Sequence, residues 1–453
     1  MPHRNNMAVA FARHVEADPT VDALVVGDER WSRGEIADMA ARATATLVGL
    51  GATAGDTVVA QYGTKAPDLA VALAAARLGC TFIPIPHRLG AYEFNYILEL
   101  ADPILLAVHE EGLADKLEIP TRTTVLDSPE VLAADPLDAP FAEEPADHIA
   151  LIGFTSGSTG RPKGVMHRWP SMDWTTGFLA SVVDHQVGEP ICVTGAGAGA
   201  PGFTFFTYFG LTRGAPIVTA ERWDPARVLE LMHREQTVWS TMVPTMLYQM
   251  LEVAEADPST PMPTAMRGVS MGGAFMSESL IQRARQLLGL EVLRVYAMAE
   301  CMMNCHMRLT DPEADRDLMD GWPGPGDDVK VVGRKKDLII RGGFNIDPVE
   351  VEELIRKHDR TRDVAVVGYA DEKFGERACA FVLVNPGEEF ELSELVSFLL
   401  EFGLSKDKLP ERLVCITDMP RSPDGKILKG ELRQRLAAEA ERWLHKPVVA
   451  INA

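Results

Sequence analysis

Positions 155–164 read Thr155-Ser156-Gly157-Ser158-Thr159-Gly160-Arg161-Pro162-Lys163-Gly164 and follow a strand-like run at 149–154. Glycines let backbone N–H groups turn inward around an anion, the hydroxyls add hydrogen-bond donors, and Lys163 adds a positive charge. The stretch is not a Walker A loop, because Pro162 stands five residues after Gly157 and no Gly-Lys-Ser/Thr follows. A flexible Ser/Gly linker is the alternative. The preceding strand and the Arg-Pro-Lys-Gly ending favour a loop that holds a phosphate-bearing nucleotide.

The composition is typical of a soluble globular enzyme of two or three domains, with 453 residues, 46% hydrophobic and 24% charged. A formal net charge of −21 argues against nucleic acid or an anionic membrane as the main partner. The six cysteines are too sparse for a disulfide scaffold, residues 1–13 lack the apolar core of a signal peptide, and no run is long enough to span a membrane. We therefore expect a cytoplasmic protein.

Helix and strand patterns alternate along most of the chain. Ser32 and Glu35 form a capping box before a helical run, and strand-like and helical runs then follow one another with short links. Such alternation predicts parallel sheets covered by helices. The pattern changes near Gly333, after which the runs suggest a small α+β unit. We predict an α/β fold with a large domain at 1–335 and a small α+β domain at 336–453.

Four further motifs accompany the loop at 155–164. They are Gly272-Gly273-Ala274, Tyr296-Ala297-Met298-Ala299-Glu300, Gly333-Arg334-Lys335-Lys336-Asp337 with Gly342-Gly343, and Pro423-Asp424-Gly425-Lys426-Ile427. In this order the five motifs resemble those of the adenylate-forming superfamily, which contains acyl-CoA ligases, peptide-synthetase adenylation domains and beetle luciferases. The resemblance covers nearly the whole chain and is strongest to an acyl-CoA ligase. It implies that the domain at 336–453 is mobile.

The resemblance also implies a role for each matching residue. Glu300 would hold Mg²⁺, and Lys163 and Lys426 would act as catalytic cations, with Lys426 bridging the substrate carboxylate and the α-phosphate. Without the other motifs, Lys426 would be interpreted as an exposed lysine of a Pro/Gly loop. The residues implied to bind the nucleotide are Thr155, Ser156, Gly157, Ser158, Thr159, Gly160, Gly272, Gly273, Ala274, Tyr296, Ala299 and Arg334.

A two-step reaction follows from the same resemblance. The acid would attack ATP to give an acyl-adenylate, and the CoA thiol would then displace AMP. The first step needs Lys426 in the site, whereas the second needs a tunnel for the pantetheine arm at Gly342 and Gly343. Rotation of the small domain about a hinge at Lys336 would serve both steps.

Two departures from the family pattern bear on the first step. Ala299 replaces a threonine, so a hydroxyl near the α-phosphate is missing. Only about thirty residues separate Glu300 from Gly333, where the family has a longer segment with a small β-barrel and a Thr-Gly-Asp motif that holds the ribose. Asp327 and Asp328 are poor substitutes for that aspartate. We therefore predict that the third, β-barrel subdomain is missing and that nucleotide binding is weakened.

The acyl pocket is predicted from the small residues at 195–202, where relatives carry a bulky motif. Gly197, Gly199 and Gly202 suggest room for a large, rigid, apolar acid, although close backbone packing is an equal alternative. The same stretch fits a Gly-x-Gly-x-x-Gly dinucleotide fingerprint, which Pro201 and the neighbouring motifs disfavour.

A metal site is another alternative reading, because Cys301, Cys305 and His306 lie close together in the sequence. No second pair of ligands follows at a useful spacing, so ordinary buried thiols are favoured.

The sequence thus predicts an acyl-CoA ligase that makes a CoA thioester from a large apolar carboxylic acid through an acyl-adenylate. We expect thioester formation to be retained and adenylation to be weak or absent, in which case a separate enzyme would supply the adenylate. The expected ligands are ATP or acyl-AMP, CoA and Mg²⁺. The alternatives are a complete ATP-dependent ligase and an adenylating enzyme that feeds a carrier protein.

Overall fold

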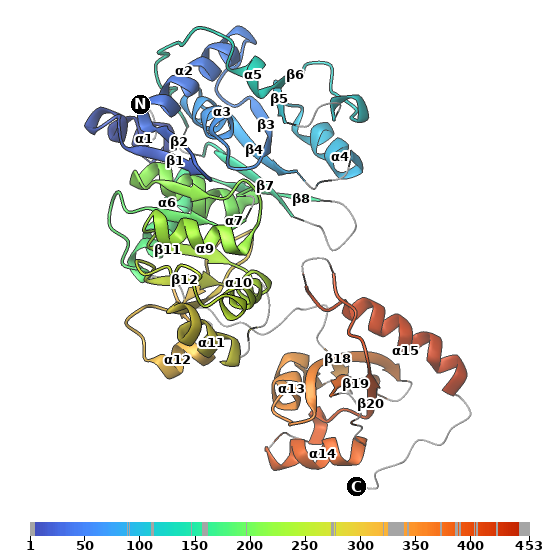
Figure 1. Cartoon of the computed structure of the whole chain (residues 1–453). Coiled ribbons are helices and arrows are strands. Elements are labelled where there is room, and N and C mark those ends of the chain that lie inside the picture. The colour runs from blue at the N-terminus through green and yellow to red at the C-terminus, as the bar shows by residue number, and fades with distance from the viewer. Residues whose placement is uncertain are drawn as a thin grey trace. The chain divides into compact units, whose positions relative to one another are not determined.

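The structure is a computed structural model of the 453-residue chain (Figure 1). It describes residues 5–87, 89, 91–109, 113–145, 147–155, 162–195, 197–272, 276, 278–319, 321–324, 339–341, 344–371, 374–385, 388, 391–402, 404, 406–422 and 425–443. Contacts divide the chain into two compact units, Met1–Val329 and Lys330–Ala453. Within the described ranges, no helix is both long and apolar enough to cross a membrane.

A six-stranded sheet in the order β6-β5-β3-β4-β7-β8 forms part of the first unit. Neighbouring strands are parallel except β7 and β8, which form an antiparallel pair. Along β3, Val58 and Ala60 belong to one hydrophobic cluster and Val59 to another, so both faces are buried, as in a helix-covered parallel sheet. The strands are β3 Thr57–Tyr62, β4 Thr81–Pro86, β5 Leu105–Val108, β6 Thr124–Asp127, β7 Leu151–Thr155 and β8 Lys163–His167.

The second sheet of this unit has nine strands in the order β15-β14-β13-β12-β11-β9-β10-β1-β2. The strands from β13 to β1 in this order are parallel, and the antiparallel pairs lie at the two edges. They are β1 Asp22–Val26, β2 Glu29–Ser32, β9 Ile191–Val193, β10 Ile217–Thr219, β11 Trp239–Met242, β12 Gly268–Met271, β13 Val292–Tyr296, β14 Cys305–His306 and β15 Trp322–Pro323.

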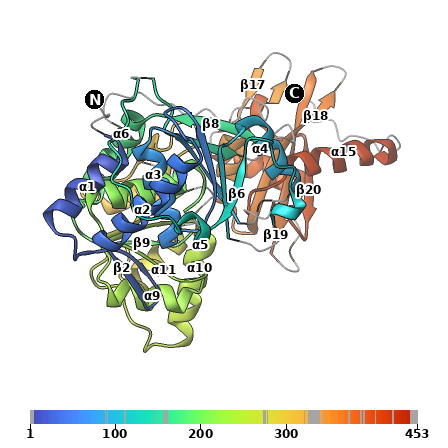
Figure 2. The ribbon, with the colours of Figure 1, turned by 90° about the horizontal axis from the view of Figure 1, so that it is seen from above.

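Helices cover both faces of both sheets (Figures 1 and 2). The largest core cluster contains residues of both sheets and of α1 Met7–Ala17, α2 Arg33–Gly49, α3 Ala66–Arg77, α6 Trp169–Val182, α7 Gly199–Gly202, the π-helix η2 Phe203–Tyr208 and α8 Phe209–Arg213. The opposite face of the nine-stranded sheet packs on α9 Pro225–Arg234, α10 Pro244–Ala256 and α11 Glu278–Leu288. The outer face of the six-stranded sheet packs on α4 Ala91–Ala101. The short helices are η1 Ala114–Lys116, α5 Ser128–Val131 and α12 Glu313–Leu318. The predicted α/β fold is confirmed.

The capping box predicted at the start of α2 is present. The backbone N–H of Glu35 donates to Ser32 Oγ at 3.2 Å, and the backbone N–H of Ser32 donates to the Glu35 carboxylate at 2.7 Å. These two bonds satisfy donors that a helix start would otherwise leave unpaired. Gly51, with φ +82°, follows the helix in a left-handed conformation that glycine adopts without strain.

The second unit is a mixed sheet with helices on both faces, as predicted for a small α+β domain. Its main strand order is β17-β16-β19-β18, and β20 pairs with β19. One face packs on α13 Pro348–Ile355 and α14 Leu392–Glu401, and the other on α15 Lys429–Trp443. The strands are β16 Ile339–Arg341, β17 Phe344–Ile346, β18 Thr361–Asp371, β19 Gly375–Val384 and β20 Arg412–Ile416, and a short helix, η3, spans Lys406–Lys408.

The short segment after β13 extends the nine-stranded sheet. It forms β14, α12 and β15, and β14 and β15 pair antiparallel at the sheet edge. Arg285 of α11 fastens α12 through ion pairs to Glu313 at 2.8 Å and Asp317 at 3.0 Å. The described part of this segment contains no β-barrel, in agreement with the predicted loss of the third subdomain.

Candidate active site

The predicted phosphate loop connects β7 to β8, and these two strands form an antiparallel pair (Figure 1). Thr155 at the end of β7 pairs with Lys163 at the start of β8, and the Thr155 hydroxyl donates to the Lys163 carbonyl at 3.5 Å. The hairpin therefore brings the two ends of the loop together and leaves the Lys163 side chain exposed. The residues between them that were predicted to bind the nucleotide, Ser156, Gly157, Ser158, Thr159 and Gly160, lie outside the described residues.

The motif that begins at Tyr296 forms a turn between β13 and β14. Tyr296 pairs with Cys305, and the backbone N–H of Asn304 donates to the Tyr296 carbonyl at 2.9 Å. This pairing closes the intervening residues into a compact turn at the carboxyl end of β13. Within the turn, Ala299 is half-buried and Glu300 is exposed. A carboxylate placed in this way could reach a phosphate-bound cation.

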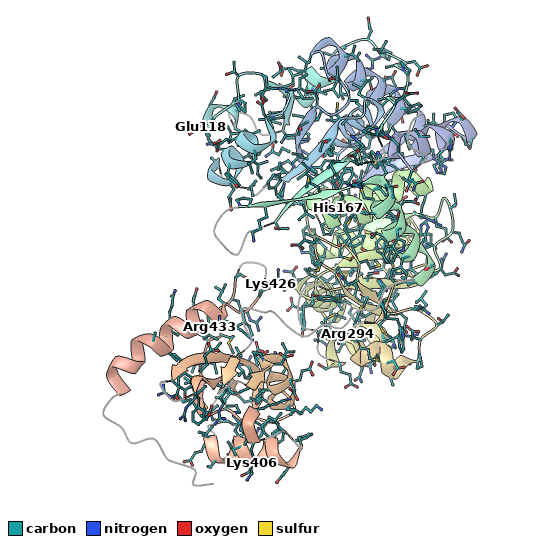
Figure 3. The ribbon with its side chains drawn as sticks, turned by 180° about the vertical axis from the view of Figure 1, so that it is seen from behind. Glu118, His167, Arg294, Lys406, Lys426 and Arg433 are labelled. Carbon is teal, nitrogen blue, oxygen red and sulfur yellow. The ribbon has the colours of Figure 1, made fainter. Side chains whose placement is uncertain are left out.

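His167, which is labelled in Figure 3, lies at the end of β8 and contacts Ala299 of this turn. It lies four residues after Lys163, and its side chain is only 4% exposed. Burial lowers its pKa, while the backbone of Ala299 and the charge of Glu300 oppose that shift. Nε2 of His167 is buried and has no hydrogen-bond partner among the described residues. The structure thus brings the Lys163 hairpin and the Glu300 turn together, a contact that the motifs alone did not predict.

Gly272 lies where β12 ends beside β13. A Cβ at this position would be 2.4 Å from the Val295 carbonyl oxygen, so the close approach of the two backbones requires glycine. Arg294 of β13 donates to the Met276 carbonyl at 3.5 Å and to the Asp317 carbonyl at 3.3 Å (Figure 3). These bonds tie the segment after β12 to α12. Gly273 and Ala274, predicted to lie against the nucleotide, fall outside the described residues.

The acyl-pocket glycines differ in their surroundings. Gly197 has φ +62°, and a Cβ there would be 2.2 Å from Thr64 Oγ1; a Cβ on Gly202 would be 2.9 Å from the carbonyl carbon of Gly197. Close packing therefore accounts for these two glycines. Gly199, with φ +77°, has no heavy atom within 4 Å of its Cβ position. The Gly-x-Gly-x-x-Gly stretch contains α7 and leads into the π-helix, and its use as an acyl pocket stays a prediction.

Gly153 of β7 packs closely against Ala200 of α7. Gly153→Ala is expected to destabilise the first unit by about 2–3 kcal/mol, because the new Cβ would lie 2.4 Å from Ala200 Cβ and 2.5 Å from Ala200 N. The matched control is Gly177→Ala in the exposed interior of α6, where an added Cβ meets no atom within 4 Å. That variant should gain about 0.5–1 kcal/mol. Thermal unfolding of both variants measures the difference, and equal melting temperatures would contradict the packing.

Cys301, Cys305 and His306 do not form a metal site. The expectation of ordinary buried thiols is confirmed for Cys305 and wrong for Cys301, which is exposed; His306 is buried. Among the described residues, no group of three or more His, Cys, Asp or Glu side chains is arranged to bind a metal. His306 is instead part of the core, where Trp239 Nε1 donates to Ser270 Oγ at 2.8 Å and Ser270 Oγ lies 2.7 Å from His306 Nε2.

Lys426 lies in a tight loop of the second unit, just before α15. Its side chain is exposed, and its backbone N–H donates to Ser422 Oγ at 3.2 Å. Gly425, with φ +80°, supplies the left-handed conformation that the turn needs. Four other predicted site residues lie outside the described residues. They are Arg334 at the nucleotide, Lys336 at the hinge, and Gly342 and Gly343 at the pantetheine tunnel.

Comparisons with known proteins match both parts of the chain. The family described as AMP-binding enzyme matches residues 11–342, and the AMP-binding enzyme C-terminal domain matches residues 350–426. The chain is similar to a long-chain-fatty-acid–CoA ligase of Mycobacterium tuberculosis, with 28% identity over 96% of this chain and 99% of that protein. That alignment runs over 502 positions, more than the length of this chain, so the relative has several dozen residues without a counterpart here.

A second sequence relative and a solved structure are also similar to this chain. A second ligase of Mycobacterium tuberculosis, named as the 3-[(3aS,4S,7aS)-7a-methyl-1,5-dioxo-octahydro-1H-inden-4-yl]propanoyl:CoA ligase, is 27% identical over 94% of this chain and 98% of its own length. The structure of ATP-bound MatB from Rhodopseudomonas palustris is similar with a TM-score of 0.77 and 23% identity, over 94% of this chain and 98% of that one. The latter similarity concerns the fold.

Proposed function

Since the chain belongs to the AMP-binding enzyme family, we propose that it is an acyl-CoA ligase that forms CoA thioesters from large apolar carboxylic acids through acyl-adenylates. The observation that carries the proposal is the position of His167, which ends the Lys163 hairpin and faces Ala299 and Glu300. Two motifs more than a hundred residues apart are thereby placed side by side. A lysine beside a carboxylate that would hold Mg²⁺ suits a nucleotide phosphate, because both the lysine and the ion would offset the phosphate charge.

The chemistry assigned to these residues is charge stabilisation and positioning. A carboxylate that attacks the α-phosphate of ATP brings two anions together, so the site must supply positive charge and in-line geometry. Lys163 would supply charge from the hairpin, and Lys426 would do so from the second unit. The exposed Glu300 carboxylate suits Mg²⁺, which prefers oxygen ligands and is commonly held by one or two carboxylates together with substrate phosphates; bound there, the ion would neutralise phosphate charge.

We further propose that thioester formation is the stronger half-reaction and that adenylation is weak. Ala299 offers no hydroxyl, and the segment from β14 to β15 replaces the longer segment that carries the ribose aspartate in the family. A lost hydrogen bond to a charged group costs about 1.5–3 kcal/mol and a neutral one about 1 kcal/mol. Together these losses correspond to a roughly 10²-fold weaker hold on the nucleotide during adenylation. The alignment with the long-chain-fatty-acid–CoA ligase is longer than this chain, so that relative has a longer sequence than this chain, which supports this part of the proposal.

A large, ring-containing acid is the substrate class that we favour. Gly199 leaves its surroundings open, whereas Gly197 and Gly202 are closely packed. One of the relatives is named for a propanoyl group on a bicyclic ring system. Burial of a large apolar acyl group would offset weakened nucleotide contacts, at about 25 cal/mol for each Å² removed from water.

The test offers the enzyme CoA together with either acid plus ATP or synthetic acyl-adenylate, over ring-containing and short linear acids. We expect thioester from the adenylate at a rate at least about tenfold above the ATP route. Equal rates by both routes would instead indicate a complete ATP-dependent ligase. Adenylate without thioester, transferred to a carrier-protein pantetheine, would indicate an enzyme that feeds a carrier protein. Absence of thioester from both routes in folded protein would refute the ligase proposal.

A further inference from the structure

The loop that carries Lys426 is tied to the sheet of the second unit by Arg421. One guanidinium nitrogen, Nη1, donates to the Gly425 carbonyl, and the other, Nη2, pairs with the Asp363 carboxylate on β18. Arg421 and Ile427 also form an isolated antiparallel bridge, so the chain enters and leaves the loop side by side. A single side chain thus contacts both the strand below the loop and the residue that precedes Lys426.

Hydrogen bonds within the loop fix its shape. The backbone N–H of Ser422 donates to the Lys426 carbonyl at 2.9 Å, and that of Gly425 donates to the Ser422 carbonyl at 2.8 Å. Ser422 Oγ accepts from the Lys426 N–H at 3.2 Å. These bonds join Ser422, Gly425 and Lys426 to one another, but they make no contact outside the loop. The Arg421–Asp363 pair adds a connection that fixes the direction of the turn relative to β18.

We propose that Arg421 is a positioning residue for Lys426, which it orients by holding the turn against Asp363. The proposal rests on the proposed function, in which Lys426 serves the adenylation step. Arginine suits the task because its rigid, planar group presents several N–H donors in fixed directions and can bind two acceptors at once. A lysine at this position would be a single flexible point charge.

A second anchor beyond the loop serves stability. Lys429, at the start of α15, pairs with Glu352 at 2.7 Å, and Glu352 also accepts the Val366 N–H at 2.7 Å. The Glu352 side chain is 6% exposed, so its loss would leave buried groups unpaired. The Arg421 side chain, by contrast, is 46% exposed and that of its partner Asp363 is 15% exposed, and a pair that is open to solvent on one side contributes less to stability than a buried one. Removal of Arg421 should therefore change the orientation of Lys426 and leave the fold intact.

The test compares Arg421→Ala, Arg421→Lys and Asp363→Asn with a matched control, Arg362→Ala, which replaces an exposed residue of β18. For each protein the measured quantity is the ratio of thioester formed from acid plus ATP to thioester formed from synthetic acyl-adenylate. Because small misplacements of a reacting group are costly, this ratio should fall at least about tenfold in Arg421→Ala. The ratio should fall less in Arg421→Lys and Asp363→Asn, and in Arg362→Ala it should equal that of the wild type. All melting temperatures should agree within about 2 °C.

Hydrogen exchange gives a second readout that does not depend on catalysis. Peptides that cover 421–428 should exchange at least about fivefold faster in Arg421→Ala, while peptides from β18 and β19 should be unchanged. An unchanged ratio or unchanged exchange in Arg421→Ala would overturn the proposal, as would equal changes in Arg362→Ala. If the wild type makes thioester by neither route, the proposed function fails, and the exchange rates still decide whether Arg421 holds the loop.

Discussion

Replacement of Lys426 by alanine is expected to lower thioester formation from acid plus ATP by about 10²–10³-fold, the usual loss when one group that stabilises developing charge is removed. The Lys426 side chain is exposed, and the backbone of Lys426 makes hydrogen bonds to Ser422. The substitution should therefore leave the fold unchanged. Thioester formation from synthetic acyl-adenylate should fall less than about threefold, because that step starts after the phosphate chemistry is complete.

The measurement uses the two routes side by side at saturating CoA. Lys406→Ala is the matched control, since Lys406 is an exposed lysine of the same unit that lies far from Lys426 (Figure 3). It should retain both activities. Equal losses by the two routes in Lys426→Ala would assign the lysine to thioester formation or to structure instead. If Lys426→Ala formed thioester from acid plus ATP at the wild-type rate, Lys426 would have no role in the reaction.

The architecture could be predicted because its signals are local and repeated. The capping box of Ser32 and Glu35, the periodic apolar positions of α2 and the buried runs of β3 and β4 each depend on neighbouring residues. The two-residue strands β14 and β15 could not be predicted, because their pairing depends on the neighbouring strand β13 rather than on their own composition. The π-helix at 203–208 likewise has no periodic signal of its own.

The site was predictable only as a set of motifs. Short patterns with fixed spacing pointed to Lys163, Glu300 and Lys426, but the contact of His167 with Ala299 joins two sheets and depends on tertiary packing. The same limit applies to Gly197, whose partner Thr64 lies far away in the sequence. An open pocket and a close packing contact both select glycine, so the sequence could not distinguish them.

Two buried histidines are expected to make the first unit sensitive to acid. His306 is fully buried, and burial lowers its pKa to about 4. Its Nδ1 donates to the Met307 carbonyl at 2.5 Å, so Nε2 accepts from Ser270 and the ring is neutral. His185 is 3% exposed with a pKa also lowered to about 4, chiefly by burial; it accepts at Nδ1 from Arg213 at 3.1 Å and donates from Nε2 to the Glu189 carbonyl at 2.9 Å.

The direction of this pH effect follows from the number of protons that the folded and unfolded states bind. Between the ordinary value of 6.5 and about 4 the unfolded chain binds protons at these histidines and the folded unit does not, so stability is complete above pH 6.5 and declines as the pH falls toward 4. Each histidine should cost up to about 1.4 kcal/mol per pH unit, or about 3 kcal/mol over the whole range. Urea unfolding followed by tryptophan fluorescence measures this decline in the first unit, which contains every tryptophan except Trp443.

His306→Leu separates this proton effect from the loss of a hydrogen bond. The variant should be less stable at pH 7, because Ser270 loses its acceptor, but its stability should depend on pH less steeply by about one proton between pH 6.5 and 4.5. Ser270→Ala is the control, since it breaks the same hydrogen bond and keeps the buried imidazole, so it should retain the steep dependence. If His306→Leu kept the wild-type slope, the acid sensitivity would have to come from other groups, because the buried imidazole would not be the site that takes up the proton on unfolding.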